Sequence, residues 1–116
     1  MNVYYLDINR SYTQQQSARE LEFWIIHLKN IKKELDLFYS EINQTKHLLI
    51  EKAILLQTSK INSILKAIQN YKEFRDWMHN DNLQNSMAFM YEHNKHKNKY
   101  LQLTKEYKIF RSKLTQ

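Results

Sequence analysis

The sequence contains no glycine, no proline and no cysteine among its 116 residues. A chain of average composition has about 7% Gly and about 5% Pro, so their absence excludes whole classes of site. Gly-rich phosphate loops, dinucleotide fingerprints and nucleophile elbows need Gly where the backbone approaches a ligand or takes a positive φ. Hairpin-rich β folds depend on Gly in their tight turns, and disulfides and thiolate metal sites need Cys. A protein built from long helices remains.

Long hydrophobic runs and an amino-terminal targeting signal are also missing. The longest apolar stretches, such as residues 23–26 and 53–56, are far shorter than the roughly 20 residues that cross a membrane. The first residues lack the basic and apolar regions of a signal peptide. We therefore expect a cytoplasmic protein with no membrane span and no cofactor.

An amphipathic composition with an excess of positive charge is present instead. Hydrophobic residues make up 42% and charged residues 26% of the chain, which is enough apolar material for a core. The net charge is +6, and residues 82–116 carry seven basic against two acidic side chains. The length corresponds to a single domain over residues 1–116.

Apolar residues recur at alternating spacings of three and four, the pattern of helices that pack on one another. The spacing predicts helices over about residues 11–43, 45–78 and 82–114, separated by Asn- and Asp-containing segments that favour turns and caps. Residues 1–10 form either an extra turn or an apolar N-terminal arm. The predicted core positions include Leu21, Trp24, Leu28, Ile31, Leu35, Phe38, Ile42, Leu49, Ile54, Ile61, Leu65, Ile68, Tyr71, Phe74, Phe89, His93, His96, Tyr100, Leu103, Tyr107, Phe110 and Leu114.

These helices predict an all-α fold, namely an elongated antiparallel up-down-up three-helix bundle with coiled-coil-like packing. Short connections make neighbouring helices antiparallel. Polar residues 57–60 interrupt the apolar face of the second helix, and a break there would give a four-helix bundle. We favour a continuous second helix because no Gly or Pro forces it to stop.

One stretch of the first helix resembles a known group of sequences. Residues 20–28 read ELEFWIIHL, and Lys33, Glu34 and Leu35 follow. This pattern resembles small all-helical proteins of Bacteroidetes-type bacteria, which open with an ELxFW helix and close with a basic, His-containing helix, similar to residues 92–113 here. The resemblance covers about half of the chain. It implies a helical bundle and no particular activity.

A surplus apolar face on the first helix indicates a surface for a partner. Phe23, Ile25 and Ile26 widen the apolar seam at one end. We expect a non-catalytic interaction or scaffold protein that acts through helix–helix contacts, with a protein partner or with itself as a homodimer. An enzyme is not expected, because the chain has no nucleophile–base arrangement and no paired carboxylates in a recognisable motif.

Nucleic-acid binding is the alternative function. Basic residues on the third helix would contact phosphates, and the tyrosines between them would stack on bases. No helix-turn-helix, zinc-finger or RNP signature accompanies them. The candidate residues are Lys95, Lys97, Lys99, Lys105, Lys108 and Arg111.

A metal-binding bundle is the third hypothesis. His93 and His96 are three residues apart, so they lie on one helical face and could chelate an ion together. The Glu-x-x-His motif of carboxylate-bridged di-iron bundles is absent from the chain. Two other readings stay open for the pair: a polar layer that fixes the register of the seam, or a group that titrates near pH 6–7.

Overall fold

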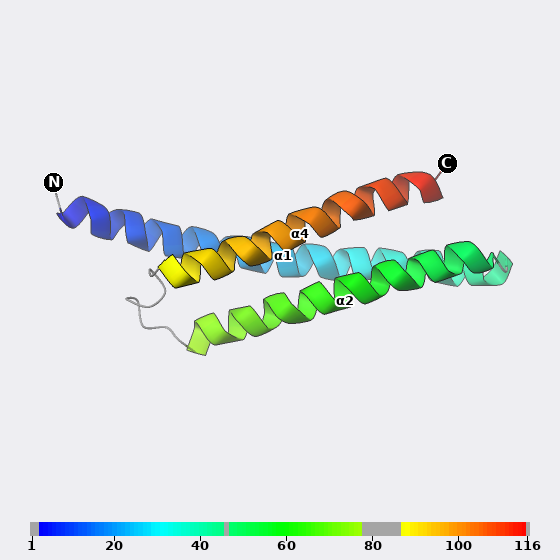
Figure 1. Ribbon diagram of the computed structural model, residues 1–116, viewed down its shortest axis with the longest axis horizontal. Coiled ribbons are helices and arrows are strands. Elements are labelled where there is room, and N and C mark those ends of the chain that lie inside the picture. Colours follow the sequence, from blue (N-terminus) through cyan, green and yellow to red (C-terminus); the bar gives the residue numbers. More distant parts are fainter. Residues whose placement is uncertain (1–2, 46, 78–86, 116) are drawn as a thin grey trace.

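The structure, a computed structural model, describes residues 3–45, 47–77 and 87–115, and among these the side chains of residues 15–42, 47–77 and 89–115. This part of the chain folds into three helices, α1 (Val3–Thr45), α2 (Leu48–Trp77) and α4 (Met87–Leu114). α2 runs back along α1, and α4 runs again in the direction of α1 (Figure 1). The molecule measures 64 × 26 × 17 Å. The predicted all-α, elongated, up-down-up arrangement is confirmed.

The helix boundaries differ from the predicted ones. α1 begins at Val3, so residues 3–10 continue the helix and do not form a separate arm. No Gly or Pro interrupts this segment. α1 also continues past the predicted end at residue 43 to Thr45. The predicted start of the third helix at residue 82 lies outside the described residues, in which α4 begins at Met87.

α2 is continuous through residues 57–60, so the alternative of a break there is wrong. The hydroxyl of Thr58 donates a hydrogen bond of 2.9 Å to the carbonyl oxygen of Ile54, one turn earlier. A Thr inside a helix can satisfy its hydroxyl in this way without ending the helix. The polar stretch is thus accommodated within a straight run of helix (Figure 1).

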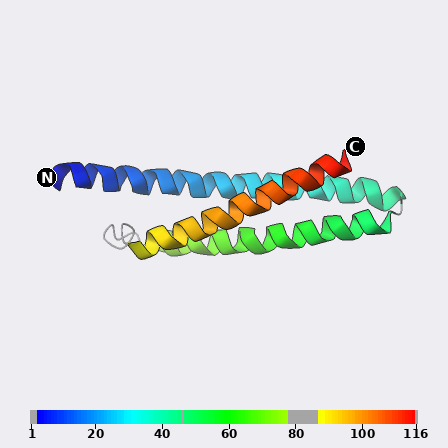
Figure 2. The same ribbon diagram turned by 45° about the horizontal axis from the view of Figure 1, so that its top comes forward.

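α1 and α2 lie side by side as an antiparallel pair that supplies most of the core (Figure 2). Near the connection, the Tyr39 hydroxyl on α1 donates a 3.1 Å hydrogen bond to Oε1 of Glu51 on α2. Each fully buried Leu or Ile contributes about 1.5–3 kcal/mol. The buried apolar residues of this pair are Leu21, Trp24, Leu28, Ile31, Leu35, Ile54, Ile61, Leu65, Ile68 and Tyr71.

α4 crosses this pair obliquely (Figure 2). Near its start, the ring of Phe89 stacks on Phe74 of α2 with 5.7 Å between centroids. Near its end, the Tyr107 hydroxyl donates a 2.5 Å hydrogen bond to Glu34 of α1. The oblique path leaves part of α2 uncovered. Leu49, a predicted core residue, is therefore 82% exposed instead of buried.

Candidate functional site

Aromatic and histidine rings from all three helices meet where α4 crosses the other two. His93 of α4 is only 8% exposed and lies 4.9 Å from Trp24 of α1 and 5.9 Å from Tyr71 of α2, measured between ring centroids. The Tyr71 hydroxyl lies 3.2 Å from Nδ1 of His93. Tyr100 stacks on Trp24 at 5.5 Å, and its hydroxyl lies 2.5 Å from Nδ1 of His27. This ring cluster joins α4 to both other helices.

His93 is held in its neutral form. Burial lowers the pKa of His93 to about 4, and the positive charge of Arg75 adds to the lowering while Glu20 opposes it. The predicted titration near pH 6–7 is therefore wrong for this residue. Its Nε2 atom is buried and makes no hydrogen bond to any side chain or backbone group that the structure describes. A neutral ring packed against Trp24 and Tyr71 matches the polar-layer interpretation.

His96 has different surroundings from His93. Its ring stacks on Tyr71 with 4.7 Å between centroids. Burial lowers the pKa of His96, although Glu92, with Oε2 3.8 Å from Nε2, favours the charged form. Within the described part of the chain, no group of three or more His, Cys, Asp or Glu side chains could hold a metal ion. The two candidate ligands therefore have no third ligand in this region.

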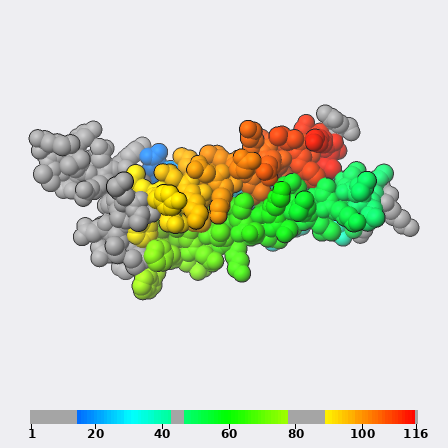
Figure 3. All heavy atoms as spheres, in the orientation of Figure 1, coloured from blue at the N-terminus to red at the C-terminus, as the bar shows by residue number. Residues whose placement is uncertain are grey.

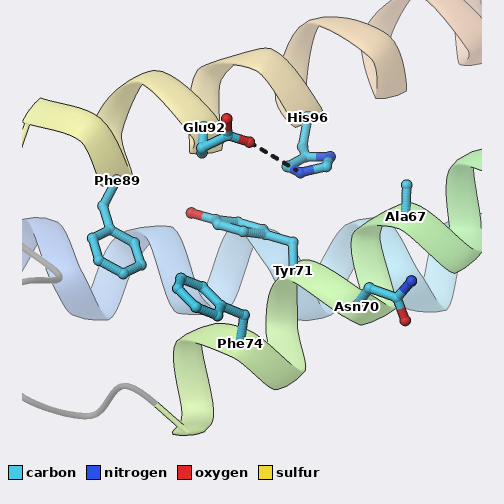
Figure 4. A pocket seen from close by; sticks show the side chains of 7 residues that line it. All are labelled: Ala67, Asn70, Tyr71, Phe74, Phe89, Glu92 and His96. Atoms are coloured by element: carbon cyan, nitrogen blue, oxygen red, sulfur yellow. Dashed lines mark ion pairs between the residues drawn. The ribbon is translucent and has the colours of Figure 1, made fainter.

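A groove runs between α2 and α4, which lie together on one face of the molecule (Figure 3). Its aromatic end is a cavity of about 380 Å³. In this cavity Phe74 and Phe89 lie close together, and the ring of Tyr71 lies below His96 and Glu92 (Figure 4). The walls are mostly apolar carbon. The lining residues are Ala67, Asn70, Tyr71, Phe74, Phe89, Glu92 and His96.

A second cavity, of about 750 Å³, lies further along the same two helices. Ser63 and Ala67 are four residues apart on the groove side of α2, and their small side chains leave the space open. Lys60 of α2 and Glu106 of α4 form an ion pair with 3.7 Å between Nζ and Oε2. From residue 59 to residue 74 of α2, the groove is about 22 Å long at 1.5 Å per residue. We call both cavities together the α2–α4 groove.

The three residues predicted to bind a partner do not share one environment. Phe23 and Ile26 are 61% and 60% exposed, whereas Ile25 is half-buried and packs against the core. Leu37, which is also exposed, lies three turns after Ile26 on the same side of α1. Phe23, Ile26 and Leu37 thus form a strip on the outer face of α1. None of them lines the α2–α4 groove.

Two of the six predicted nucleic-acid-binding residues are engaged with α1. Nζ of Lys97 lies 3.3 Å from Oε2 of Glu20. Nε of Arg111 lies 2.9 Å from Oε1 of Glu34, the carboxylate that also accepts the hydrogen bond of Tyr107. These two cations hold α4 against α1, so a ligand phosphate would have to compete with a carboxylate for each of them.

The other four predicted basic residues lie on different sides of α4. Lys95 and Lys99 are exposed and one turn apart, and Lys99 lines the α2–α4 groove. Lys108 follows Lys99 by about two and a half turns, which places it on the opposite side of the helix. Lys105 and Lys108 are both exposed. The predicted basic residues therefore do not form one face.

Sequence reasoning missed the groove and the partners of the histidines. The spacing of four between Ser59, Ser63 and Ala67 is a visible signal of an unfilled helix face, but the same region indicated a possible break. Arg75, buried with its guanidinium carbon 5.8 Å from the Tyr71 ring centroid, gave no such signal.

Among the described helices, none combines the length and the apolar character that a membrane span requires. Comparisons with known proteins found no matching family model, no similar curated protein and no similar solved structure. The geometry of the chain itself is therefore the basis for a functional conclusion.

Proposed function

We propose that this chain is a non-catalytic interaction protein whose α2–α4 groove docks a helix of a protein partner. The observation that carries the proposal is the groove itself: an open, mostly apolar channel between two helices, with cavities of about 380 and 750 Å³ along it. A helix seated there would complete a four-helix arrangement, in which each helix buries its apolar stripe against two neighbours.

Exposed leucines extend the floor of the groove along α2. Leu56 and Leu49 precede Ser63 by seven and fourteen residues, so they lie on the same side of the helix. They are 57% and 82% exposed. A row of apolar positions at this spacing is the form of surface that takes the apolar face of an amphipathic helix. Exposed leucines that follow one another along one side of a helix favour a binding role.

The aromatic end of the groove supplies an anchor pocket. Phe74 is exposed on one side of the pocket and its ring stacks on Phe89, while Tyr71 and His96 close the other end. Well-packed pockets that accept one large apolar side chain dominate the energy of many interfaces. We assign this pocket to a Leu or Phe side chain of the docked helix.

The test is a comparison of captured proteins between the parent chain and groove-filled variants. Ala67→Trp fills the aromatic cavity, and Ser63→Trp fills the longer one. Both proteins are immobilised and exposed to a lysate of the cells that encode the chain, with and without nuclease. Because the chain has no Cys, Asn70→Cys can carry a single photo-crosslinker that marks whatever occupies the groove. We expect a retained protein that crosslinks at position 70 and is lost from both Trp variants.

The control variant is Ser112→Trp, which adds the same side chain at an exposed position outside the groove. It should retain the partner as the parent does. Equal retention by the parent and both Trp variants, with helical content unchanged, contradicts the proposal. So does retention that disappears with nuclease, or loss of the partner only in the Phe23→Glu/Ile26→Glu variant, which would move the docking surface to the outer face of α1.

A further inference from the structure

We infer that the helix that the α2–α4 groove takes is acidic, an inference that rests on the proposed function. The groove carries cations on both of its sides. Lys99 of α4 lines the groove. Two further lysines lie at its margins, Lys95 of α4 one turn before Lys99, and Lys52 of α2 one turn before Leu56. All three are exposed, and none forms an ion pair with a residue that the structure describes.

The carboxylates of the groove do not balance these cations. Glu106 is paired with Lys60, at 3.7 Å between Oε2 and Nζ. Glu92 faces His96, whose pKa burial lowers, so the imidazole does not offset the charge of the Glu92 carboxylate. The groove and its margins therefore hold four lysines against two glutamates. An amphipathic helix with Glu or Asp beside its apolar face complements this arrangement.

A second copy of this chain does not supply such a helix. Its exposed apolar strip on α1, which contains Phe23, Ile26 and Leu37, carries exposed Arg19 and Lys33 but also exposed Glu22 and Glu41, so it has no net negative charge. The two basic residues are one turn before Phe23 and Leu37, and the two acidic residues are one turn before Ile26 and one turn after Leu37, so all four lie along the strip. Docking that strip into the α2–α4 groove would bring as many cations as carboxylates towards Lys95 and Lys99, without the excess of negative charge that an acidic helix offers. The charges thus favour a different protein as the occupant.

The inference can be tested with three fluorescein-labelled peptides of about 20 residues, long enough to span the groove as helices. They share one apolar face of leucines with a Phe anchor. The positions that flank this face are Glu in the first peptide, Gln in the second and Lys in the third, all good helix formers. Binding to the full chain is measured by fluorescence anisotropy at about 50 mM and about 300 mM salt.

We expect the Glu peptide to bind about tenfold more tightly than the Gln peptide at the lower salt, and the Lys peptide to bind more weakly than both. The advantage of Glu over Gln should shrink at the higher salt. Equal binding of the three peptides overturns the acidic preference while leaving a helix-docking groove. Failure of all three to bind contradicts both the inference and the proposed function.

Two double Lys→Glu variants test whether the preference for the Glu peptide arises at the groove. Lys95→Glu/Lys99→Glu should weaken binding of the Glu peptide about tenfold and strengthen binding of the Lys peptide. Lys105→Glu/Lys108→Glu makes the same change in net charge at exposed positions that do not line the groove, so it should leave both affinities within about twofold. Equal effects of the two double variants would show a general charge effect and overturn the inference.

A labelled single-stranded oligonucleotide of similar length distinguishes nucleic acid from an acidic helix. The apolar residues of the groove can bury the apolar face of a helix but not a phosphate backbone. The oligonucleotide should therefore bind more weakly than the Glu peptide. Tighter binding of the oligonucleotide, lost in Lys95→Glu/Lys99→Glu, would overturn the inference in favour of nucleic acid.

Discussion

The hydroxyl of Tyr71 on α2 lies 3.2 Å from Nδ1 of His93 on α4, at the centre of the ring cluster that joins the three helices. One turn further along α4, His96 stacks on the same tyrosine from within the α2–α4 groove. Tyr71 therefore contacts both histidines. This residue thus belongs both to the ring cluster and to the lining of the groove.

Acid is expected to destabilise the fold through His93. The imidazole of the unfolded chain titrates near 6.5, whereas burial lowers the pKa of His93 in the fold to about 4. Between these values the unfolded state binds a proton that the folded state does not, so stability is full above about pH 6.5 and falls as the pH drops towards 4. We expect a loss on the order of 2 kcal/mol between about pH 7.5 and about pH 4.5, measured by urea unfolding followed by circular dichroism.

The double variant His93→Leu/Tyr71→Phe removes the titrating ring together with its hydrogen-bond partner. Replacing both hydrogen-bond partners by apolar groups can leave the free energy of unfolding nearly unchanged at pH 7. Because the titrating imidazole is gone, this variant should lose less stability in acid than the parent does. His47→Leu, at an exposed histidine, should keep the full loss. An unchanged loss in the double variant would contradict the role assigned to His93.

Leu→Ala substitutions should distinguish the buried core from the face of α2 that α4 does not cover. Leu28 is fully buried between helices, so Leu28→Ala should lower the free energy of unfolding by about 2–5 kcal/mol. Leu49→Ala removes the same atoms at an exposed position and should cost less than about 0.5 kcal/mol. Similar losses for the two variants would mean that α4 covers α2 more completely than the oblique crossing allows. Chemical denaturation measures both.

Tyr107 fastens the end of α4 to α1. Its hydroxyl donates to Glu34, and burial followed by this hydrogen bond raises the pKa of Tyr107 above its ordinary value of 10.0. Above about pH 10 the unfolded state releases the phenolic proton first, so this contribution to stability is lost as the pH rises. Tyr107→Phe should lower the free energy of unfolding by about 1–2 kcal/mol at pH 8. The variant should then lose less stability than the parent as the pH is raised further. Tyr91→Phe, at an exposed tyrosine, should match the parent in thermal unfolding at both pH values.

The predicted partner surface on α1 should separate into two kinds of residue. Ile25 packs against the core, so Ile25→Asp should lower the free energy of unfolding by about 1–3 kcal/mol. Phe23 is exposed, and Phe23→Asp should change it by less than about 0.5 kcal/mol. Thermal unfolding of the two variants checks this. A large loss in Phe23→Asp would indicate that Phe23 is covered in solution, as the predicted homodimer requires.

The core of the α1–α2 pair could be predicted from the sequence because its seam is almost purely apolar. Alternating spacings of three and four from Leu21 to Leu35 have one physical explanation, a helix packed along its length on another helix. The same period on α2 did not distinguish Ile54, which is buried, from Leu49 and Phe74, which are exposed. Period alone places residues on a face. It does not say where the neighbouring helix stops covering that face.

The path of α4 could not be predicted because its seam is mixed. His93, Tyr100 and Tyr107 satisfy the heptad spacing, yet each is held by a polar partner on another helix, and those partners set the crossing. The α2–α4 groove follows from that crossing together with the small side chains of Ser63 and Ala67. Its location therefore needed the arrangement of three helices, whereas its apolar residues were already apparent in the sequence.

The most direct test of a helix-docking groove is a nuclear magnetic resonance titration of the ¹⁵N-labelled full chain with the Glu peptide. We expect the largest amide shift changes within residues 59–74 of α2 and 89–106 of α4, which contain the residues that line the groove, with little change around Phe23 and Ile26 of α1. Shift changes centred on the outer face of α1, or no changes at saturating peptide, would contradict it.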